Sequence, residues 1–151
     1  MAGNHPVMEI SLSLNLPREA LTVPVARHVV RHAMEAVGVA AACVSDVELA
    51  LSEACTNVLL HAGSGDYDVR LDLADRTCSI RVVDVGRGLD PAAGDPAPDA
   101  EAERGRGLVL LRALVDSVRF DTRPDAGTVV RFEKRLSYAN PALLGGAPPA
   151  G

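Results

Sequence analysis

Residues 53–61 of this chain read Glu53-Ala54-Cys55-Thr56-Asn57-Val58-Leu59-Leu60-His61. If the stretch is helical, Glu53, Asn57 and His61 fall at every fourth position and share one face. Much of the remaining surface of that helix is apolar, with Leu51, Ala54, Cys55, Val58 and Leu59. A polar stripe on a mostly apolar helix faces either solvent or a polar cleft, and the spacing alone leaves both readings open.

The chemistry of this stripe suits a nucleotide site. The side-chain oxygen of Asn57 is a hard, neutral ligand of the kind that Mg²⁺ takes together with water and phosphate oxygens. A carboxylate one turn away, on Glu53, could accept a proton from a hydroxyl or a water that attacks a terminal phosphate. Asn57 is therefore the candidate metal ligand and Glu53 the candidate general base.

Signals on either side set the predicted limits of this helix. Ser45-Asp46-Val47-Glu48 has the form of a capping box, in which Ser45 and Glu48 satisfy each other's free backbone amides, so the helix is predicted to begin at Ser45. Gly63-Ser64-Gly65 ends it after about Ala62. Glu48 lies on another face, and we expect it to supply only capping and surface charge.

The segments before this helix predict a strand and a first helix. The strand covers Met8 to Leu16, where alternation places Ile10, Leu12, Leu14 and Leu16 on one half-buried face. From about Glu19 to Val37 the apolar spacing becomes helical, with a predicted stripe of Val25, Val29, Ala33, Ala36 and Val37. Pro24 fits the first turn of this helix, and Gly38 ends it.

The rest of the chain predicts four strands and one more helix. The strands are expected over Asp68–Leu73, Thr77–Val83, Val118–Thr122 and Thr128–Leu136, the last two forming a closing hairpin. Pro91 to Arg104, rich in Ala, Pro and Asp, reads as a long loop, and Leu108 to Asp116 as a helix. Strands and helices do not alternate strictly. We therefore predict an α+β fold: a two-layer α/β sandwich with a mixed, largely antiparallel sheet and the helices on one face.

Composition narrows the function further. A length of 151 residues with 48% hydrophobic residues suits one domain with a real core. The net charge of -5 argues against a nucleic-acid binder that relies on phosphate neutralisation. The cysteines, Cys43, Cys55 and Cys78, form neither a disulfide framework nor a metal-ligand pattern. No apolar run could span a membrane and no signal peptide is evident, so we expect a cytoplasmic protein without membrane contact.

Lys134 is the only lysine in the sequence. A P-loop requires a lysine after its glycines, and a eukaryote-like protein kinase requires a strand lysine on the phosphates. Lys134 lies in neither context. If the chain binds ATP, it does so without a lysine.

A first glycine motif follows the predicted strand that ends near Val83. Asp84 is followed by Val85-Gly86-Arg87-Gly88. A carboxylate there could accept a hydrogen bond from an adenine amino group, and Gly86 and Gly88 remove side chains, so a flat base could approach the backbone. The alternative is an ordinary Asp-x-Gly turn.

A second motif, Gly105-Arg106-Gly107, stands directly before the helix predicted from Leu108. Backbone amides at a helix N-terminus make a ready phosphate site. Arg104 and Arg106 either add positive charge there or are simply solvated. Thr128 is a candidate hydrogen-bond partner for the base, although threonine is common in strands.

Each signal is weak alone, but their order is specific. Residues 53–61, then Asp84–Gly88, Gly105–Leu108 and Gly127–Thr128, resemble the N, G1 and G2 boxes of the GHKL (Bergerat-fold) ATPases. Within that superfamily the chain is similar to the stand-alone anti-sigma factor serine kinases of Gram-positive bacteria, also in its short length and in Ala26-Arg27. The resemblance covers about Ile10 to Leu136. It implies a histidine-kinase-like ATPase domain over residues 8–138, and we expect residues 139–151 to form a disordered tail.

The resemblance implies roles for the candidate residues. Asn57 would ligate Mg²⁺, and Glu53 would act as the general base toward a serine of a protein substrate. Asp84 would bind the adenine of ATP, assisted by Thr128, and residues 91–104 would form the ATP lid. The other nucleotide-binding residues would be Gly86, Gly88, Arg104, Gly105, Arg106, Gly107 and Leu108. Arg27 would match a position that such kinases use to contact partner proteins.

The resemblance also implies a function: an anti-sigma factor that uses ATP to phosphorylate an anti-anti-sigma protein, sequesters a sigma factor and forms a homodimer. One alternative is a non-catalytic, nucleotide-gated regulator that binds proteins. Glu53 argues against it, because a pure binder needs no base beside the metal ligand. The other alternative is structural, with the polar stripe on the surface and the glycines in turns.

Overall fold

A computed structural model describes residues 8–60, 65–84, 98–123 and 127–139, with only the backbone described at 98–105 and 122–123. The elements along the chain are β1 (Ile10–Leu16), α1 (Thr22–Ala36), α2 (Ala41–Leu60), β2 (Tyr67–Leu73), β3 (Thr77–Asp84), α3 (Pro98–Leu114), β4 (Ser117–Arg123) and β5 (Gly127–Arg135). This order of strands and helices is the one that the sequence predicts.

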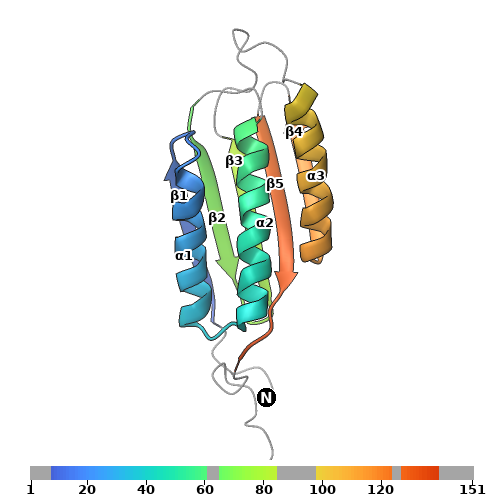
Figure 1. The fold of residues 1–151 in the computed structure, drawn as a ribbon. Helices are drawn as coiled ribbons and strands as arrows, with labels where there is room; N and C mark the ends of the chain where they lie inside the picture. The colour runs from blue at the N-terminus through green and yellow to red at the C-terminus, as the bar shows by residue number, and fades with distance from the viewer. Residues whose placement is uncertain (1–7, 61–64, 85–97, 124–126, 140–151) are drawn as a thin grey trace, which may run out of the picture.

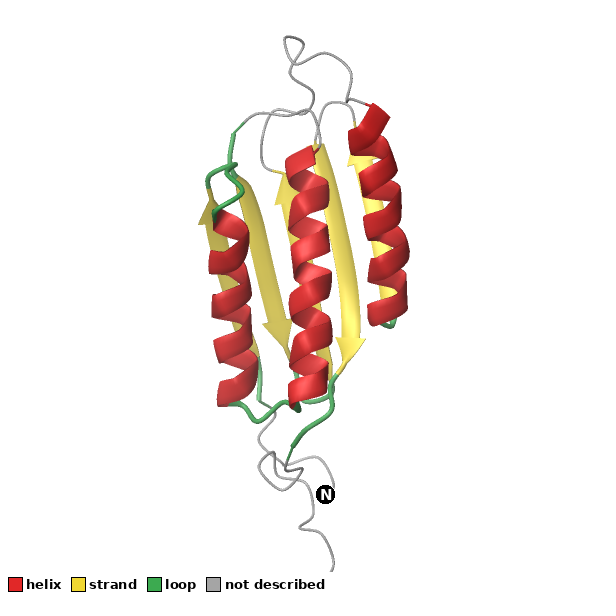
Figure 2. Cartoon of the chain, viewed as in Figure 1, coloured by secondary structure: helices red, strands yellow, loops and turns green. Residues whose placement is uncertain are grey.

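The five described strands form one sheet in the order β1-β2-β3-β5-β4. Each neighbouring pair is antiparallel, including the predicted β4–β5 hairpin. The three helices lie side by side over one face of this sheet (Figure 1; Figure 2). The predicted two-layer α+β architecture is confirmed.

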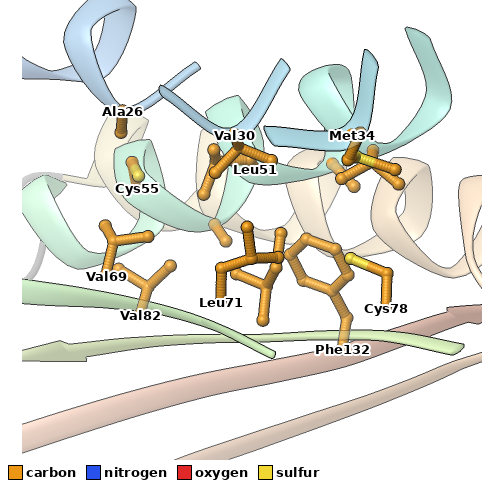
Figure 3. Close-up of a cluster of buried hydrophobic side chains, with 14 of the residues drawn as sticks. Ala26, Val30, Met34, Leu51, Cys55, Val69, Leu71, Cys78, Val82 and Phe132 are labelled. Atoms are coloured by element: carbon orange, nitrogen blue, oxygen red, sulfur yellow. The ribbon is translucent and has the colours of Figure 1, made fainter. Parts of the chain in front are cut away.

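The hydrophobic core lies between the helices and the sheet (Figure 3). On the helix side it includes Ala26, Val30 and Met34 of α1 and Leu51 and Cys55 of α2; on the sheet side it includes Val69, Leu71, Cys78, Val82 and Phe132. Burying one such aliphatic or aromatic side chain contributes about 1.5–3 kcal/mol. Because aliphatic side chains dominate this set, the core is built without the large aromatic cluster common in domains of this size.

The stripe of α1 that faces the core differs from the predicted one. The buried residues of this helix are Thr22, Ala26, Val30 and Met34. Val25, placed in the stripe by the sequence, is 49% exposed, whereas Ala33 and Val37 are partly buried against the core. The prediction was wrong because valine or alanine fills so many positions of this segment that its spacing fits more than one stripe.

The start of α2 also differs from the prediction. The helix begins at Ala41, and the amide of Val44 already donates to the carbonyl of Ala40 (3.0 Å). Ser45 therefore lies inside the helix, and the predicted capping box is wrong. Just before the helix, Val39 forms an isolated bridge with Tyr138, a contact 99 positions away along the chain that local sequence does not reveal. None of the described helices is both long and apolar enough to cross a membrane.

Glu48 is not the surface charge that the sequence predicts. It is a buried residue, and its Oε1 and Oε2 accept hydrogen bonds from Nε (2.7 Å) and Nη2 (3.2 Å) of Arg31 on α1. These hydrogen bonds and the charge of Glu48 raise the pKa of Arg31. Glu48 therefore ties α2 to α1.

Candidate functional site

Asn57 is a buried polar residue in the second half of α2. It is 2% exposed, and neither its Oδ1 nor its Nδ2 has a hydrogen-bond partner among the described residues. A buried polar atom left unsatisfied costs about 1–3 kcal/mol. Native proteins therefore satisfy nearly all such atoms, with protein, water or a bound ligand. At Asn57 the polar stripe turns toward the interior of the molecule, which rules out the purely solvated reading at this position.

Glu53, one helical turn before Asn57, lies against Gly107 of α3. A Cβ added to Gly107 would be 2.8 Å from Glu53 Oε2 and 3.9 Å from its Cδ. Any side chain at position 107 would therefore have to displace the carboxylate. Glu53 itself is only partly buried, so its carboxylate sits at the seam between α2 and α3.

The second glycine motif does not precede a helix. Helix α3 begins at Pro98, ten residues before the predicted start, so Gly105 and Gly107 lie inside it. Residues 98–104 belong to this helix and not to the predicted loop. The prediction was wrong because Pro98 is well suited to the first helical position and the acidic residues Asp99 and Glu101 favour a helix N-terminus. Residues 105–107 therefore do not offer free backbone amides at a helix start.

The other predicted residues near this helix are placed as follows. Arg106 is exposed on α3, and Leu108 is partly buried against the core. For Arg104 the structure describes the helical backbone alone. His61, Gly86, Gly88 and residues 91–97 of the predicted lid lie outside the described residues.

Asp84 ends β3 and is almost completely buried, 1% exposed. Its Oδ1 accepts a hydrogen bond from Nη2 of Arg18 (2.5 Å). Arg18 also donates from Nη1 to the carbonyl of Val58 (2.9 Å) and from Nε to the carbonyl of Gly65 (3.2 Å). Local sequence contains no signal for Arg18, because a lone arginine between a strand and a helix is typical of a solvated turn.

Thr128 and Gly127 begin β5 beside Asp84. Val129 pairs with Val83 in the antiparallel register, so the preceding residue of β5, Thr128, adjoins the end of β3. Gly127 has φ of 86°, and a Cβ there would be 2.6 Å from the carbonyl oxygen of Asp84. Thr128 is fully buried, and its Oγ1 has no hydrogen-bond partner among the described residues. Glycine is required at position 127 both by the backbone conformation and by the close approach.

Contacts along this end of the molecule join the candidate residues into one group. Gly107 lies against Glu53, and Glu53 is one turn from Asn57. Arg18 then connects the carbonyl of the next residue, Val58, to Asp84, which adjoins the start of β5. The structure thus brings together residues that lie far apart in the sequence, from α2, α3, β3 and β5.

Arg27 is not part of this group. Its Nη2 lies 3.7 Å from Oε2 of Glu48, and its side chain is 44% exposed. Glu48 precedes Asn57 by nine residues, which corresponds to about 13 Å along a helix axis. The predicted partner-contact residue is therefore on a separate, accessible surface of α1 and α2.

Cys55 and Cys78 are not candidates for nucleophilic chemistry. Burial raises the pKa of Cys55 to about 12, against a hydrogen bond from the Tyr67 hydroxyl that lowers it. Burial likewise raises the pKa of Cys78 to about 12. Because a thiolate is the reactive form, these thiols are inert at neutral pH.

Comparison with known proteins gives one family and a set of named relatives. The profile of the histidine kinase-like ATPase domain matches residues 16–134. The chain is 33% identical over 107 residues to a serine-protein kinase RsbW of Bacillus licheniformis, a match that covers 62% of this chain and 66% of that protein. It is 30% identical over 101 residues to an anti-sigma F factor of Caldanaerobacter subterraneus subsp. tengcongensis, covering 62% of this chain and 71% of that protein.

A longer match is 26% identical over 139 residues to a serine-protein kinase RsbW of Bacillus velezensis, covering 83% of this chain and 86% of that protein. Among solved structures, that of the RsbU and RsbW domains of Rv1364c from Mycobacterium tuberculosis has a TM-score of 0.65 at 23% identity. This match covers 84% of our chain but 32% of that one, and it supports the fold alone. The first-named RsbW relative is likewise covered over just under two thirds of its length.

Proposed function

This chain belongs to the histidine kinase-like ATPase domain family, and we propose that it binds ATP with Mg²⁺ and transfers the terminal phosphate to a serine of a partner protein. Relatives named serine-protein kinase RsbW and anti-sigma F factor support this choice of reaction. By analogy with those names, the chain is an anti-sigma factor that phosphorylates an anti-anti-sigma protein and sequesters a sigma factor. Residues 8–138 are the proposed domain, and they contain the family match.

The observation that carries the proposal is the buried side chain of Asn57. Its two polar atoms lack partners among the described residues, which is the condition expected of a ligand-binding carboxamide. Asn57 Oδ1 suits Mg²⁺, which prefers oxygen ligands and takes phosphate oxygens and water beside them. When bound, the ion would supply positive charge against the charge of the phosphates. Asn57 is therefore the proposed metal ligand.

Glu53 is the proposed general base. Its carboxylate is one helical turn from Asn57 and is confined on one side by Gly107. As the serine Oγ forms a bond to the terminal phosphorus, the bond from that phosphorus to the bridging oxygen breaks and ADP leaves. The hydroxyl proton passes to the carboxylate of Glu53. Confinement by Gly107 limits the positions the carboxylate takes up, which favours a fixed distance to the attacking hydroxyl.

Asp84 and Thr128 are proposed to bind the adenine. Both are buried, and both border the end of β3, so a base held there would be shielded from water. A carboxylate accepts hydrogen bonds from the adenine amino group, and a hydroxyl can donate or accept. Gly86, Gly88, Arg104, Gly105, Arg106, Gly107 and Leu108 remain proposed members of the nucleotide pocket.

The proposed partner surface is separate from this pocket. The side chain of Arg27 on α1 is 44% exposed, and we assign it to contact with the sigma factor or the anti-anti-sigma protein. A homodimer is proposed as the assembly, following the family resemblance.

A second candidate function is a nucleotide-gated regulator without catalysis. It shares Asn57, Asp84 and Thr128 with the kinase but gives Glu53 no role. The close approach of Gly107 to Glu53 favours the kinase. A glycine inside a helix costs about 1 kcal/mol relative to alanine, and here it leaves room for the carboxylate that the kinase uses as its base. The two functions differ in whether phosphate moves to the partner.

The test uses the purified chain, ATP labelled in its terminal phosphate, and a candidate partner encoded nearby that carries an exposed serine. We expect Mg²⁺-dependent labelling of the partner, loss of labelling in Glu53→Gln, and unchanged ATP affinity in that variant. Asn57→Ala should lose both labelling and Mg-ATP binding. Glu35→Gln, which changes an exposed glutamate of α1, is the matched control and should behave as the wild type.

The outcomes separate the two functions. Labelling that persists in Glu53→Gln would exclude Glu53 as the general base. Nucleotide-dependent binding of the partner without labelling would favour the regulator. Absence of any ATP binding by the wild type at millimolar nucleotide would exclude both the kinase and the nucleotide-gated regulator.

A further inference from the structure

The guanidinium of Arg18 joins three separate parts of the chain. It reaches the carbonyl of Val58 near the end of α2, the carbonyl of Gly65 before β2, and the carboxylate of Asp84 at the end of β3. These three acceptors lie 40, 47 and 66 residues away from Arg18 in the sequence. The contacts use Nε, Nη1 and Nη2, so each nitrogen of the planar fork is occupied.

This ion pair is well shielded from solvent. The side chain of Arg18 is 16% exposed and that of Asp84 is 0% exposed. Taking a carboxylate out of water is costly unless a cation and hydrogen bonds compensate. Arg18 supplies both, and the rigid fork of arginine meets several acceptors at fixed angles, which the single ammonium of lysine cannot do.

A single hydrogen bond from Arg18 does not use up the acceptor capacity of the Asp84 carboxylate. A carboxylate offers about four acceptor positions over two oxygens. Arg18 donates to one of these positions, on Oδ1, and thereby restricts the rotation of the carboxylate plane. A carboxylate that is fixed before binding loses less conformational freedom when a ligand donates to it.

We propose that Arg18 is a positioning residue of the nucleotide site, which holds the carboxylate of Asp84 in the orientation that receives the exocyclic amino group of adenine. This inference rests on the proposed function, since it assumes that Asp84 faces the base. It predicts that Arg18 matters for nucleotides that carry the amino group and not for those that lack it. A merely structural arginine would affect both kinds of nucleotide equally.

The test compares two nucleotides on the full chain: ATP, and purine riboside triphosphate, which has hydrogen in place of the amino group. Dissociation constants are measured with Mg²⁺ by calorimetry for the wild type, Arg18→Met and Arg18→Lys. Charge-assisted hydrogen bonds are worth enough that we expect Arg18→Met to weaken ATP on the order of 10-fold. The affinity of Arg18→Met for purine riboside triphosphate should change less than about 2-fold, because this nucleotide has no amino group to donate to Asp84.

Two further variants keep the test decisive. Arg18→Lys keeps a cation near Asp84 but lacks the planar guanidinium group, so its loss of ATP affinity should be intermediate. If Arg18→Met does not fold, the comparison of the two nucleotides is made with Arg18→Lys. Arg70→Met is the matched control, because Arg70 is an arginine of β2 with a 48% exposed side chain, paired with Asp68 at 3.8 Å. It should leave both affinities unchanged.

Equal weakening of the two nucleotides by the Arg18 variants would overturn the inference and leave Arg18 a structural residue. Unchanged ATP affinity would overturn it as well. In both cases the wild type still binds ATP, so the proposed function stands. If the wild type binds neither nucleotide, the proposed function fails and the inference fails with it.

Discussion

A methyl group on Gly107 would be 2.8 Å from Oε2 of Glu53, so the glycine leaves the space that this carboxylate occupies. The contact joins α3 to the polar stripe of α2 at the proposed base. Gly107→Ala should therefore displace the carboxylate and lower phosphate transfer at least about 10-fold, since misplacing a reacting group by about 1 Å has large effects on rate. ATP affinity should stay within about 2-fold, because the added methyl group of residue 107 is directed at Glu53, which is not assigned to binding.

The same variant offers a built-in control. Alanine is a better helix former than glycine by about 1 kcal/mol, so Gly107→Ala should not lose stability. Combining it with Glu53→Asp, which shortens the side chain by one methylene, relieves the clash and should recover part of the lost rate relative to Gly107→Ala. A rate for Gly107→Ala equal to that of the wild type would show that the glycine is kept for another reason.

Gly127→Ala should be strongly destabilising. The residue has φ of 86°, and the added Cβ would approach the carbonyl oxygen of Asp84 to 2.6 Å. The backbone conformation alone costs an L-residue on the order of 1–2 kcal/mol, and the clash with rigid backbone adds to it. Urea unfolding should give a loss of about 2 kcal/mol or more. Ser117→Ala, at an exposed position of β4, should change little. Equal stability of the two variants would contradict the close approach.

Four arginines stand directly opposite one another across the sheet: Arg70, Arg81, Arg131 and Arg119, on β2, β3, β5 and β4. Arg70 and Arg131 have acidic partners on their own strands, Asp68 at 3.8 Å and Glu133 at 3.1 Å, whereas no ion pair of Arg81 occurs among the described residues. Like charges opposite each other destabilise a sheet, by roughly 0.2–1 kcal/mol per pair.

Arg81→Thr should therefore raise the free energy of unfolding by about 0.5–1 kcal/mol at low salt, because it removes two like-charge neighbours and places a good strand former there. The gain should shrink as salt screens the charges. Arg81→Lys keeps the charge and should show no gain. A gain that does not depend on salt would mean that strand propensity alone is responsible.

Alkaline pH should destabilise the fold through its buried thiols. Burial raises the pKa of Cys55 and Cys78 from 9.0 to about 12. Below pH 9 the thiols are protonated in both the folded and the unfolded chain, so their contribution is fully present. Between pH 9 and 12 the unfolded chain loses these protons while the folded chain keeps them. The free energy of unfolding should fall, by up to about 1.4 kcal/mol per pH unit for each thiol.

Urea unfolding under reducing conditions from pH 8 to 11 measures this slope. Cys78→Ala should lose stability at every pH because it leaves a cavity, but its stability should fall less steeply above pH 9 than that of the wild type. Val82→Ala removes buried apolar groups without a thiol and should keep the wild-type slope. Parallel slopes for all three proteins would refute the role of Cys78.

The fold could be predicted well where the signal is periodic. The sheet strands, the hairpin and the helix that carries Asn57 follow from alternation and helical spacing, which depend on neighbours a few residues away. The start of α3 could not be predicted, because Pro98 to Arg104 read as a loop from composition although Pro and acidic residues also suit a helix start. The stripe of α1 was ambiguous because apolar residues lie on several of its faces.

In the candidate site, Glu53, Asn57, Asp84 and Thr128 were identified from the sequence, whereas Arg18 was not. Its partner Asp84 is 66 residues away, and the pairing depends on how β1, β2 and β3 come into register. Glu48 was misjudged for the same reason, since its partner Arg31 belongs to another helix.

The sequence by itself determined the order of the elements, the single helical layer and the residue types available for chemistry, because local spacing and side-chain chemistry are properties of short stretches. The tertiary structure alone decided that Asn57 is buried, that Gly107 presses on Glu53, and that Arg18 holds Asp84. These are contacts between elements distant along the chain, and their geometry is set by sheet register and helix packing, which no short stretch of residues encodes.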